Sequence, residues 1–366
     1  MNILFIHSDG VTEWNCSEHR ISVPYRAMRR HGIQCEAVGL QEWESINPRV
    51  DTVSNLADLL IVQRNLFGAT LQKIAYYKAL GKAVVVDFDD AYHQMGLDTG
   101  SPSSEFWHNG FVSVNSAGQK QLLDPPPLRQ IEWGAKLAGA VSSPSQVILD
   151  DWNKLLGVKT YWLPNYIEPW LYQFHDVYRD HGEIYIGGGG SMSHLKSWQR
   201  SGAVEALIRL MRADKRVHVV VAGDERVAKL YRGAPPSRIH KKAWLPYALY
   251  SRSLSYLDIG LLPLAGEYDM RRSWIKPVEY SAMGIPWVGS NYPSNHLEFG
   301  SGVLVDNTPE AWYTAIKAVV DNLTVMRTNS LNASDYVKEF YSVDKNAGKL
   351  LATYTQIIED SQSCTS

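Results

Sequence analysis

The chain has 366 residues, of which 45% are hydrophobic, so it can bury a sizeable core and divide into two domains. Its 36 Lys and Arg against 38 Asp and Glu give a formal charge of −2, which excludes a bulk electrostatic attraction to nucleic acid or anionic membranes. No stretch approaches the ~20 apolar residues of a membrane span.

The N-terminus and the cysteines indicate the compartment. The first residues, MNILFIHSDG, predict a buried strand, because the apolar run is too short for a signal peptide. The three cysteines, Cys16, Cys35 and Cys364, are scattered without metal-like spacing, which is typical of a reducing compartment. We therefore expect a cytoplasmic protein.

In the first half of the chain, strand and helix patterns alternate. Apolar runs without internal alternation predict strands of a parallel sheet that is covered on both faces. The predicted strands are 2–7, 35–40, 59–63, 83–88 and a short one near 141, and the predicted helices are 23–30, 71–80, 125–140 and 147–156. Residues 93–124 predict a long loop, which we expect to contact the acceptor through Trp107 and His108.

After YWLPNYIEPW (161–170), which predicts a domain boundary, the alternation restarts. The predicted strands are 183–186, 217–222, 258–262 and 286–289, the predicted helices are 203–211, 276–282 and 309–322, and 336–358 predicts closing helices. This pattern predicts the α/β class, with two doubly wound, Rossmann-like domains facing across a cleft. We expect an N-terminal domain over 1–164, a C-terminal domain over 165–335, and closing helices over 336–366 that pack back on the N-terminal domain.

Four glycines at 187–190, in IYIGGGGSMSHLKSW (184–198), predict a loop between a strand and a helix. Glycine lets the backbone approach a ligand closely, and a helix N-terminus offers free N–H groups to a phosphate. The predicted anion-binding residues here are Gly188, Gly189, Gly190, Ser191 and His194. The pattern is not GxGxxG, and a tight turn with a serine cap is the alternative.

A charged segment, DMRRSWIKPVEYSAMGIPWVGS (269–290), lies at a predicted strand–helix junction of the same domain. Arg271, Arg272 and Lys276 supply the cations that a diphosphate needs. Glu279 follows Lys276 by three residues, so it shares a helix face and can accept hydrogen bonds from ribose hydroxyls. The alternative is an ordinary surface Lys–Glu pair.

These residues resemble the retaining glycosyltransferases of GT-B architecture, close to glycosyltransferase family 4. The resemblance rests on DIGLLPL (258–264), the arginine–lysine–glutamate segment and GVLVDNTPEAWYTAI (302–316), in the family's order and spacing, and covers nearly all of 160–320. WLPY (244–247) is similar to the segment that faces the nucleotide base, which implies Trp244 and Leu245, and LPNYIEP (163–169) is similar to the interdomain linker. Arg271 stands where many members carry a first glutamate, as in a sub-branch with an arginine–lysine set.

The N-terminal half resembles the same branch more loosely. The residues that would face the acceptor are Arg20, Arg64, Asp87, Asp90 and His93, with Asp89 added as a catalytic residue. The run DFDD (87–90) has an alternative interpretation, because Asp-x-Asp at a strand end can hold Mg²⁺ or Mn²⁺ in another transferase architecture.

The resemblance implies a glycosyltransferase that moves a sugar from a UDP- or GDP-sugar to an acceptor hydroxyl, with Arg271 and Lys276 stabilising the departing diphosphate. It requires no cofactor and no metal. A nucleotide-sugar epimerase of the same fold and a non-catalytic nucleotide- or glycan-binding protein remain alternatives. The acceptor stays open among polysaccharide, lipid-linked sugar, protein and modified DNA, and so does the oligomeric state.

Overall fold

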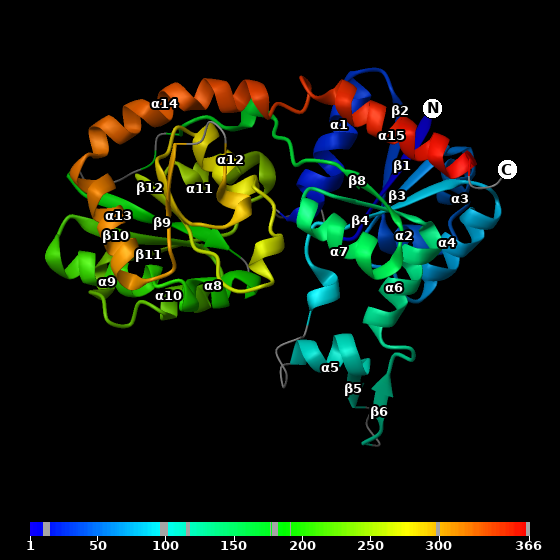
Figure 1. Ribbon diagram of the computed structural model, residues 1–366, viewed down its shortest axis with the longest axis horizontal. Coiled ribbons are helices and arrows are strands. Elements are labelled where there is room, and N and C mark those ends of the chain that lie inside the picture. The colour runs from blue at the N-terminus through cyan, green and yellow to red at the C-terminus, as the bar shows by residue number, and fades with distance from the viewer. Residues whose placement is uncertain are drawn as a thin grey trace. The chain divides into compact units, whose positions relative to one another are not determined.

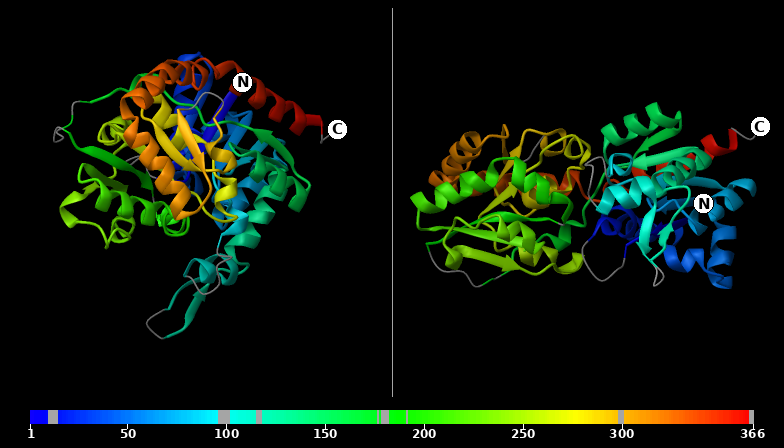
Figure 2. Two further views of the ribbon diagram at one scale, coloured as in Figure 1. Left: turned by 60° about the vertical axis from the view of Figure 1, so that its left-hand side comes forward. Right: turned by 90° about the horizontal axis from the view of Figure 1, so that it is seen from below.

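The computed structural model describes residues 1–9, 15–95, 102–114, 118–175, 177, 182–190, 192–297 and 301–363. The chain forms two compact units, shown in Figures 1 and 2. Unit 1 comprises residues 1–11, 16–165 and 346–366, and unit 2 comprises residues 12–15 and 166–345. Each unit contains a six-stranded parallel sheet, so the predicted α/β class is confirmed.

The sheet of unit 1 has the order β2-β1-β3-β4-β7-β8. Its strands are β1 Asn2–His7, β2 Gln34–Gly39, β3 Leu59–Gln63, β4 Ala83–Asp87, β7 Ala140–Ser143 and β8 Lys159–Trp162. Its covering helices are α1 Val23–Arg30, α2 Leu40–Glu44, α3 Pro48–Leu56, α4 Ala69–Ala79, α6 Pro127–Ala138, α7 Gln146–Leu156 and α15 Ala347–Ser363. The order reverses between β1 and β3, where α/β sheets bind ligands at the carboxyl ends of their strands.

An extension of unit 1 replaces the predicted long loop. It contains helix α5 (Pro102–Asn109) and an antiparallel pair, β5 (Phe111–Val114) and β6 (Lys120–Leu122), which project from the body of unit 1 in Figure 1. Aromatic contacts attach α5 to that body: Phe106 lies 6.3 Å from Phe67, and Trp107 lies 6.0 Å from Tyr92, between ring centroids. The expectation of a structureless loop is therefore wrong.

The sheet of unit 2 has the order β11-β10-β9-β12-β13-β14, which is the Rossmann order 3-2-1-4-5-6. Its strands are β9 Ile184–Gly190, β10 Val217–Gly223, β11 Ile239–Lys242, β12 Ile259–Leu262, β13 Trp287–Ser290 and β14 Gly302–Val305. Its helices are α8 Leu195–Arg200, α9 Ala203–Ala213, α10 Glu225–Lys229, α11 Tyr250–Leu254, α12 Ile275–Ala282, α13 Pro309–Asp321 and α14 Leu323–Phe340. Residue 336, the predicted start of the closing helices, lies inside α14.

Local sequence signals set several helix ends. Asn47 caps α3 by accepting from the backbone N–H groups of Arg49 and Val50, and Thr308 caps α13 with a proline at its first position. Helices α6 and α7 end at Gly139 and Gly157, both left-handed, as helix C-caps commonly are. These junctions fix where each helix meets its strand.

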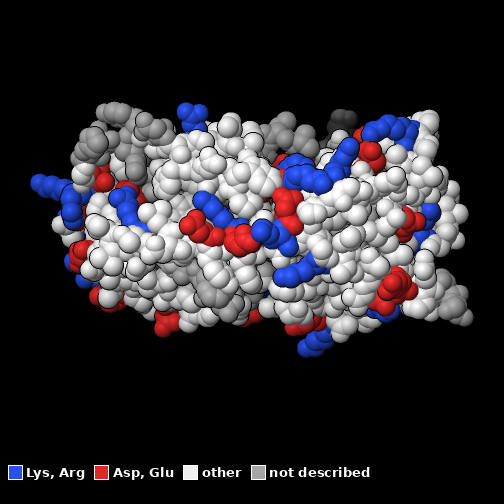
Figure 3. Space-filling view, turned by 90° about the horizontal axis from the view of Figure 1, so that it is seen from above, with Lys and Arg blue, Asp and Glu red and all other residues white. Residues whose placement is uncertain are grey.

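Each sheet encloses its own core of aliphatic and aromatic side chains. In unit 1, the ring of Phe88, which directly follows β4, stacks on Trp152 of α7 at 4.6 Å between centroids. On the face shown in Figure 3, Lys and Arg side chains lie among Asp and Glu rather than forming a continuous basic field. Within the described part of the chain, no helix has both the length and the apolar character needed to cross a bilayer.

Candidate functional site

Lys276 and Glu279 form a buried pair in the first turns of α12. Lys276 Nζ lies 3.4 Å from Glu279 Oε2, and the Glu279 side chain is fully buried while that of Lys276 is 13% exposed. A surface pair of this spacing would leave both groups in water. The burial therefore rules out the alternative of an ordinary surface pair, because a buried charge persists only when it is paired and hydrogen-bonded.

Two tyrosines hold this pair from either side. The Tyr172 hydroxyl donates to Glu279 Oε1 at 3.2 Å, and the Lys276 ammonium donates to the Tyr250 hydroxyl at 2.7 Å. Burial, followed by the negative charge of Glu279, raises the pKa of Tyr250 well above its usual value. Its hydroxyl thus stays neutral, and the positive charge of Lys276 is not cancelled from that side.

Aromatic rings form the rest of the Lys276 environment. The Lys276 ammonium lies 4.7 Å from the ring centroid of Tyr250 and 6.0 Å from that of Trp244, within cation–π range. Trp244 is partly buried and packs against Gly223 at the end of β10, where a Cβ would lie 2.5 Å from the indole. Gly223 has φ +102°, so both its backbone and the ring favour glycine. Leu245, the next residue, is also partly buried.

The four glycines do not form a loop. Residues 187–190 are the last four residues of β9, paired with β10 along their length. Glycine at position 188 makes room for Tyr280 of α12, because a Cβ on Gly188 would lie 2.7 Å from the Tyr280 hydroxyl. Ser191 lies outside the described residues, and α8, which follows, has only six residues. The predicted glycine cradle is therefore corrected to a strand end.

Arg272 links this strand end to the segment before α12. Its Nε donates to Asp269 Oδ1 at 3.1 Å, and its Nη2 donates to Ser193 Oγ at 3.1 Å. Asp269 is itself buried and accepts from Ser197 Oγ at 2.6 Å. Arg271 takes a different direction, because its Nη1 donates to the Glu267 carbonyl at 2.6 Å.

His194 lies near both cations of this site. Its pKa is lowered well below the usual value, first by burial and then by the positive charges of Arg272 and Lys276. The imidazole is therefore neutral at physiological pH. Both cations are ion-paired in this structure, Arg272 with Asp269 and Lys276 with Glu279, and they lie at the end of β9 beside the β9/β12 switch point.

In unit 1, Arg20 and Asp87 form a closed ion pair. Arg20 Nε and Nη2 donate to the two Asp87 oxygens at 2.8 and 2.6 Å, and Ser142 Oγ donates to Asp87 Oδ2 at 2.7 Å. Arg20 Nη1 also donates to the Leu163 carbonyl at 2.6 Å and to Asn165 Oδ1 at 2.9 Å. Both side chains are almost fully buried, so this pair joins the strand ends rather than facing an acceptor.

Arg64 lies at the β1/β3 switch point with an unusual backbone. Its φ is +41°, which is uncommon for a residue other than glycine and marks a constrained position. Its guanidinium pairs with Asp9 and with Asp89, the latter at 3.2 Å. Burial acts to lower the pKa of Arg64, but Asp89 and the neighbouring groups outweigh it and raise that pKa. Asp90, the residue after Asp89, is also buried.

The other predicted acceptor residue, His93, points elsewhere. Its Nε2 lies 2.8 Å from Asp151 Oδ2 on α7, its ring meets Trp152 edge-on, and its side chain is 7% exposed. The DFDD metal interpretation also finds no support, because Asp87 and Asp89 each face a guanidinium. Among the described residues, no three His, Cys, Asp or Glu side chains are grouped to hold a metal ion.

The sequence reasoning missed the groups that orient the site. These are Tyr172, Tyr250, Tyr280, Asp269 and Ser193. None stands in a recognisable motif, and a tyrosine in a strand–helix protein is more often a core residue. The only available signal was the aromatic density of WLPYALY (244–250) close to the charged segment.

The sequence matches no protein-family model and no curated protein. Its structure, however, is similar to solved structures along nearly its whole length. HepE from Anabaena, solved with UDP and glucose, is 15% identical with a TM-score of 0.61, covering 98% of both chains. Sucrose-phosphate synthase from Thermosynechococcus elongatus is 11% identical with a TM-score of 0.66, covering 98% of this chain and 99% of that chain.

A Listeria monocytogenes protein described as a putative UDP-N-acetylglucosamine 2-epimerase is 12% identical with a TM-score of 0.54, covering 98% of this chain and 97% of that chain. At these identities the likeness shows the fold. The chain therefore has the GT-B fold, which glycosyltransferases share with this epimerase.

Proposed function

We propose that the protein is a nucleotide-sugar-dependent glycosyltransferase whose donor diphosphate binds unit 2 at the end of β9. The observation that carries the proposal is the buried Lys276–Glu279 pair held by Tyr172 and Tyr250. A buried charged pair adds little net stability to a fold, which favours a functional role for this one. Arg272 and Lys276, which both lie close enough to His194 to lower its pKa, supply the N–H groups that phosphate oxygens would contact.

The proposed roles follow from position. Lys276 and Arg272 would stabilise the charge on the departing diphosphate, and Arg271, whose guanidinium contacts Glu267 here, would contribute only after turning toward it. Glu279 would accept hydrogen bonds from the ribose, and Trp244 with Leu245 would contact the base. The Gly188–Gly190 backbone and His194 would border the phosphates. No cofactor beyond the UDP- or GDP-sugar is required.

The proposed reaction is a hexosyl transfer with retention. The bond between the sugar's anomeric carbon and the phosphate oxygen breaks, and a bond to the acceptor oxygen forms on the same face. The acceptor hydroxyl proton passes to the departing phosphate oxygen, so the chain need not supply a base. The residues assigned to the acceptor are ion-paired in this structure: Arg20 with Asp87, Arg64 with Asp89, and His93 with Asp151. Each would contact an acceptor only by exchanging its present partner, and Asp90 also stays a candidate.

Donor hydrolysis tests this proposal: the full chain is incubated with UDP-glucose, UDP-N-acetylglucosamine or GDP-mannose in the absence of an acceptor. Chromatography would measure free nucleoside diphosphate, and NMR would give the anomeric configuration of the released sugar. Slow release of UDP or GDP with an α-sugar from an α-donor supports a retaining transferase. Binding of every donor without release would contradict it.

Epimerisation is the second candidate, because the Listeria epimerase has the same fold over 98% of this chain. The same incubation separates the two. An epimerase converts the nucleotide sugar into its isomer, which chromatography detects directly. Such conversion would replace the transferase proposal.

A further inference from the structure

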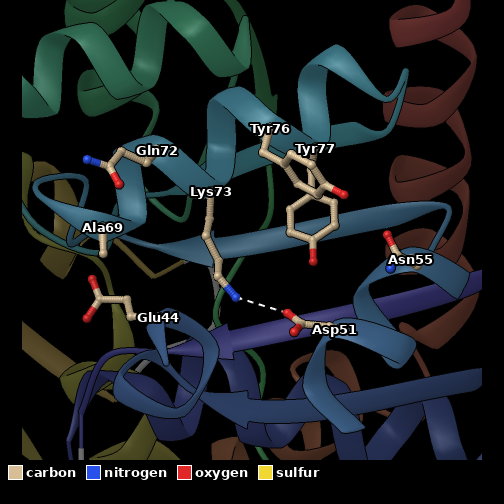
Figure 4. Close-up of a pocket in the computed structure, with 8 residues that line it drawn as sticks. All are labelled: Glu44, Asp51, Asn55, Ala69, Gln72, Lys73, Tyr76 and Tyr77. Carbon is tan, nitrogen blue, oxygen red and sulfur yellow. Dashed lines mark hydrogen bonds and ion pairs between the residues drawn. The ribbon is translucent and has the colours of Figure 1, made fainter. Parts of the chain in front are cut away.

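Two pockets flank helix α4 in unit 1, and they lie on helices rather than at the strand ends. The first, about 450 Å³, lies between α4 and the α2–α3 segment, as Figure 4 shows. The second, about 640 Å³, lies between α4 and α6. Gln72 lines both pockets, so they form one continuous surface, here called the α4 surface. Both are open hollows of the surface rather than enclosed cavities.

The first pocket is rich in hydrogen-bonding groups. In Figure 4, Lys73 points from α4 toward Asp51 on α3, with 3.1 Å between Nζ and Oδ1, and Glu44 lies on the other side. Asn55 and Gln72 add two exposed amides, each of which both donates and accepts. The Tyr76 side chain, 56% exposed, stands at the rim.

The second pocket is mainly apolar. Leu71, Ala75 and Leu137 line it together with Trp133, whose side chain is 52% exposed. The exposed Trp133 indole lies beside this apolar lining. Trp133 and Tyr76 thus place two accessible rings on the α4 surface, with the Gln72 amide common to both pockets.

The charges of the α4 surface select a neutral occupant. Glu44 and Asp51 carry two negative charges, and Lys73 and Lys136 carry two positive charges. The balance gives no attraction for phosphates, nucleic acid or anionic lipid, and the two carboxylates would repel them. A lipid surface would also cover the exposed Asn55 and Gln72 amides without offering them hydrogen-bond partners.

We propose that the α4 surface binds a neutral oligosaccharide. A pyranose ring has apolar C–H faces that stack on flat aromatic rings and hydroxyls at its edge that pair with amides and carboxylates. The α4 surface offers exposed aromatic rings for the C–H faces, and amides and carboxylates for the hydroxyls. This inference rests on the proposed function in one respect: a transferase that elongates or decorates a glycan would hold a further length of its acceptor here.

The test uses the full chain and the neutral probes maltohexaose, cellohexaose, laminarihexaose and chitohexaose at millimolar concentration. Saturation-transfer NMR and calorimetry would measure binding. We expect at least one probe to bind, and the Trp133→Ala/Tyr76→Ala double variant to weaken it about tenfold or more. The matched control is Trp170→Ala/Tyr336→Ala, which removes an exposed tryptophan and tyrosine of unit 2 and should leave binding unchanged.

Three outcomes would overturn the inference. They are no binding of any probe, equal binding by the double variant, and tighter binding to phosphatidylglycerol vesicles than to all four sugars. The UDP-induced thermal shift of the same variants separates this inference from the proposed function. A normal UDP shift without sugar binding refutes the α4 surface alone, whereas sugar binding without any response to a nucleoside diphosphate refutes only the donor proposal.

Discussion

The Tyr250 hydroxyl accepts a hydrogen bond from the Lys276 ammonium, with 2.7 Å between the two atoms. Because Tyr250 stays neutral and its ring lies 4.7 Å from the ammonium, it orients the charge without cancelling it. This contact makes the position of Lys276 depend on a residue of another helix, and it leads to separable predictions for the members of the site.

Replacing Lys276 by alanine should lower kcat about 10²-fold or more, a loss of ~2.7 kcal/mol in the transition state. The charge is needed most as the diphosphate departs. Steady-state kinetics with the best donor would measure it. Lys317→Ala is the control, since Lys317 also pairs with an acid of its own helix but on the surface. Equal kinetics for both variants would exclude Lys276 from the reaction.

Glu279→Gln should mainly raise the donor KM and leave kcat nearly unchanged. Its hydrogen bonds to ribose would exist both before and during the reaction, so their loss weakens binding uniformly. Donor titrations would give both constants, and thermal unfolding would check that the buried site still folds. A fall in kcat at constant KM would contradict the ribose assignment.

Tyr250→Phe should lower kcat about tenfold, equivalent to ~1.4 kcal/mol and in the range of one hydrogen bond to a charged group. The ring remains, so packing is preserved while the acceptor for Lys276 is lost. Tyr256→Phe is the matched control, because the Tyr256 ring lies 3.5 Å from the ammonium of a different lysine, Lys242. If the two variants are equally active, Tyr250 has only a packing role.

Turnover should survive EDTA, because cationic side chains would do the work of a metal. The measurement compares initial rates with and without chelator, followed by addition of Mn²⁺. Complete loss that Mn²⁺ restores would return the DFDD segment to consideration. In that event Asp89→Asn should abolish metal binding as well as activity.

Acid should destabilise the protein partly through His194. Its folded pKa lies well below 6.5, the ordinary value, so the unfolded chain binds a proton first as the pH falls. The free energy of unfolding should therefore decrease below about pH 6.5, by at most about 1.4 kcal/mol per pH unit from this group. Denaturant unfolding at pH 7.5 and 5 would show a smaller decrease for His194→Gln. An unchanged decrease would mean that His194 is not buried as a neutral ring.

The strands and helices could be predicted from the sequence, whereas the side-chain contacts of the candidate site could not. Apolar runs such as 59–63 and 83–88 predicted strands because a strand covered on both faces has no polar side. The Lys276–Glu279 spacing likewise predicted a shared helix face. By contrast, residues 187–190 continue β9 by pairing with β10, and Gly188 leaves space for the hydroxyl of Tyr280, a residue distant in sequence. The contacts of Tyr172 with Glu279 and of Tyr250 with Lys276 form only when the chain folds, so no local sequence pattern predicts them.

Helix α15 has a consequence for how the protein is made. It belongs to unit 1, where Tyr354 meets Phe5 of β1 edge-on at 6.0 Å, yet it is the last helix of the chain. On a ribosome, the roughly 180 residues of unit 2 must follow the first sheet before α15 emerges, a delay of roughly 10–40 s at 5–20 residues per second. Until then the apolar groups of β1 that α15 covers lack their partner. We therefore expect the nascent first unit to expose these apolar groups until α15 has been made.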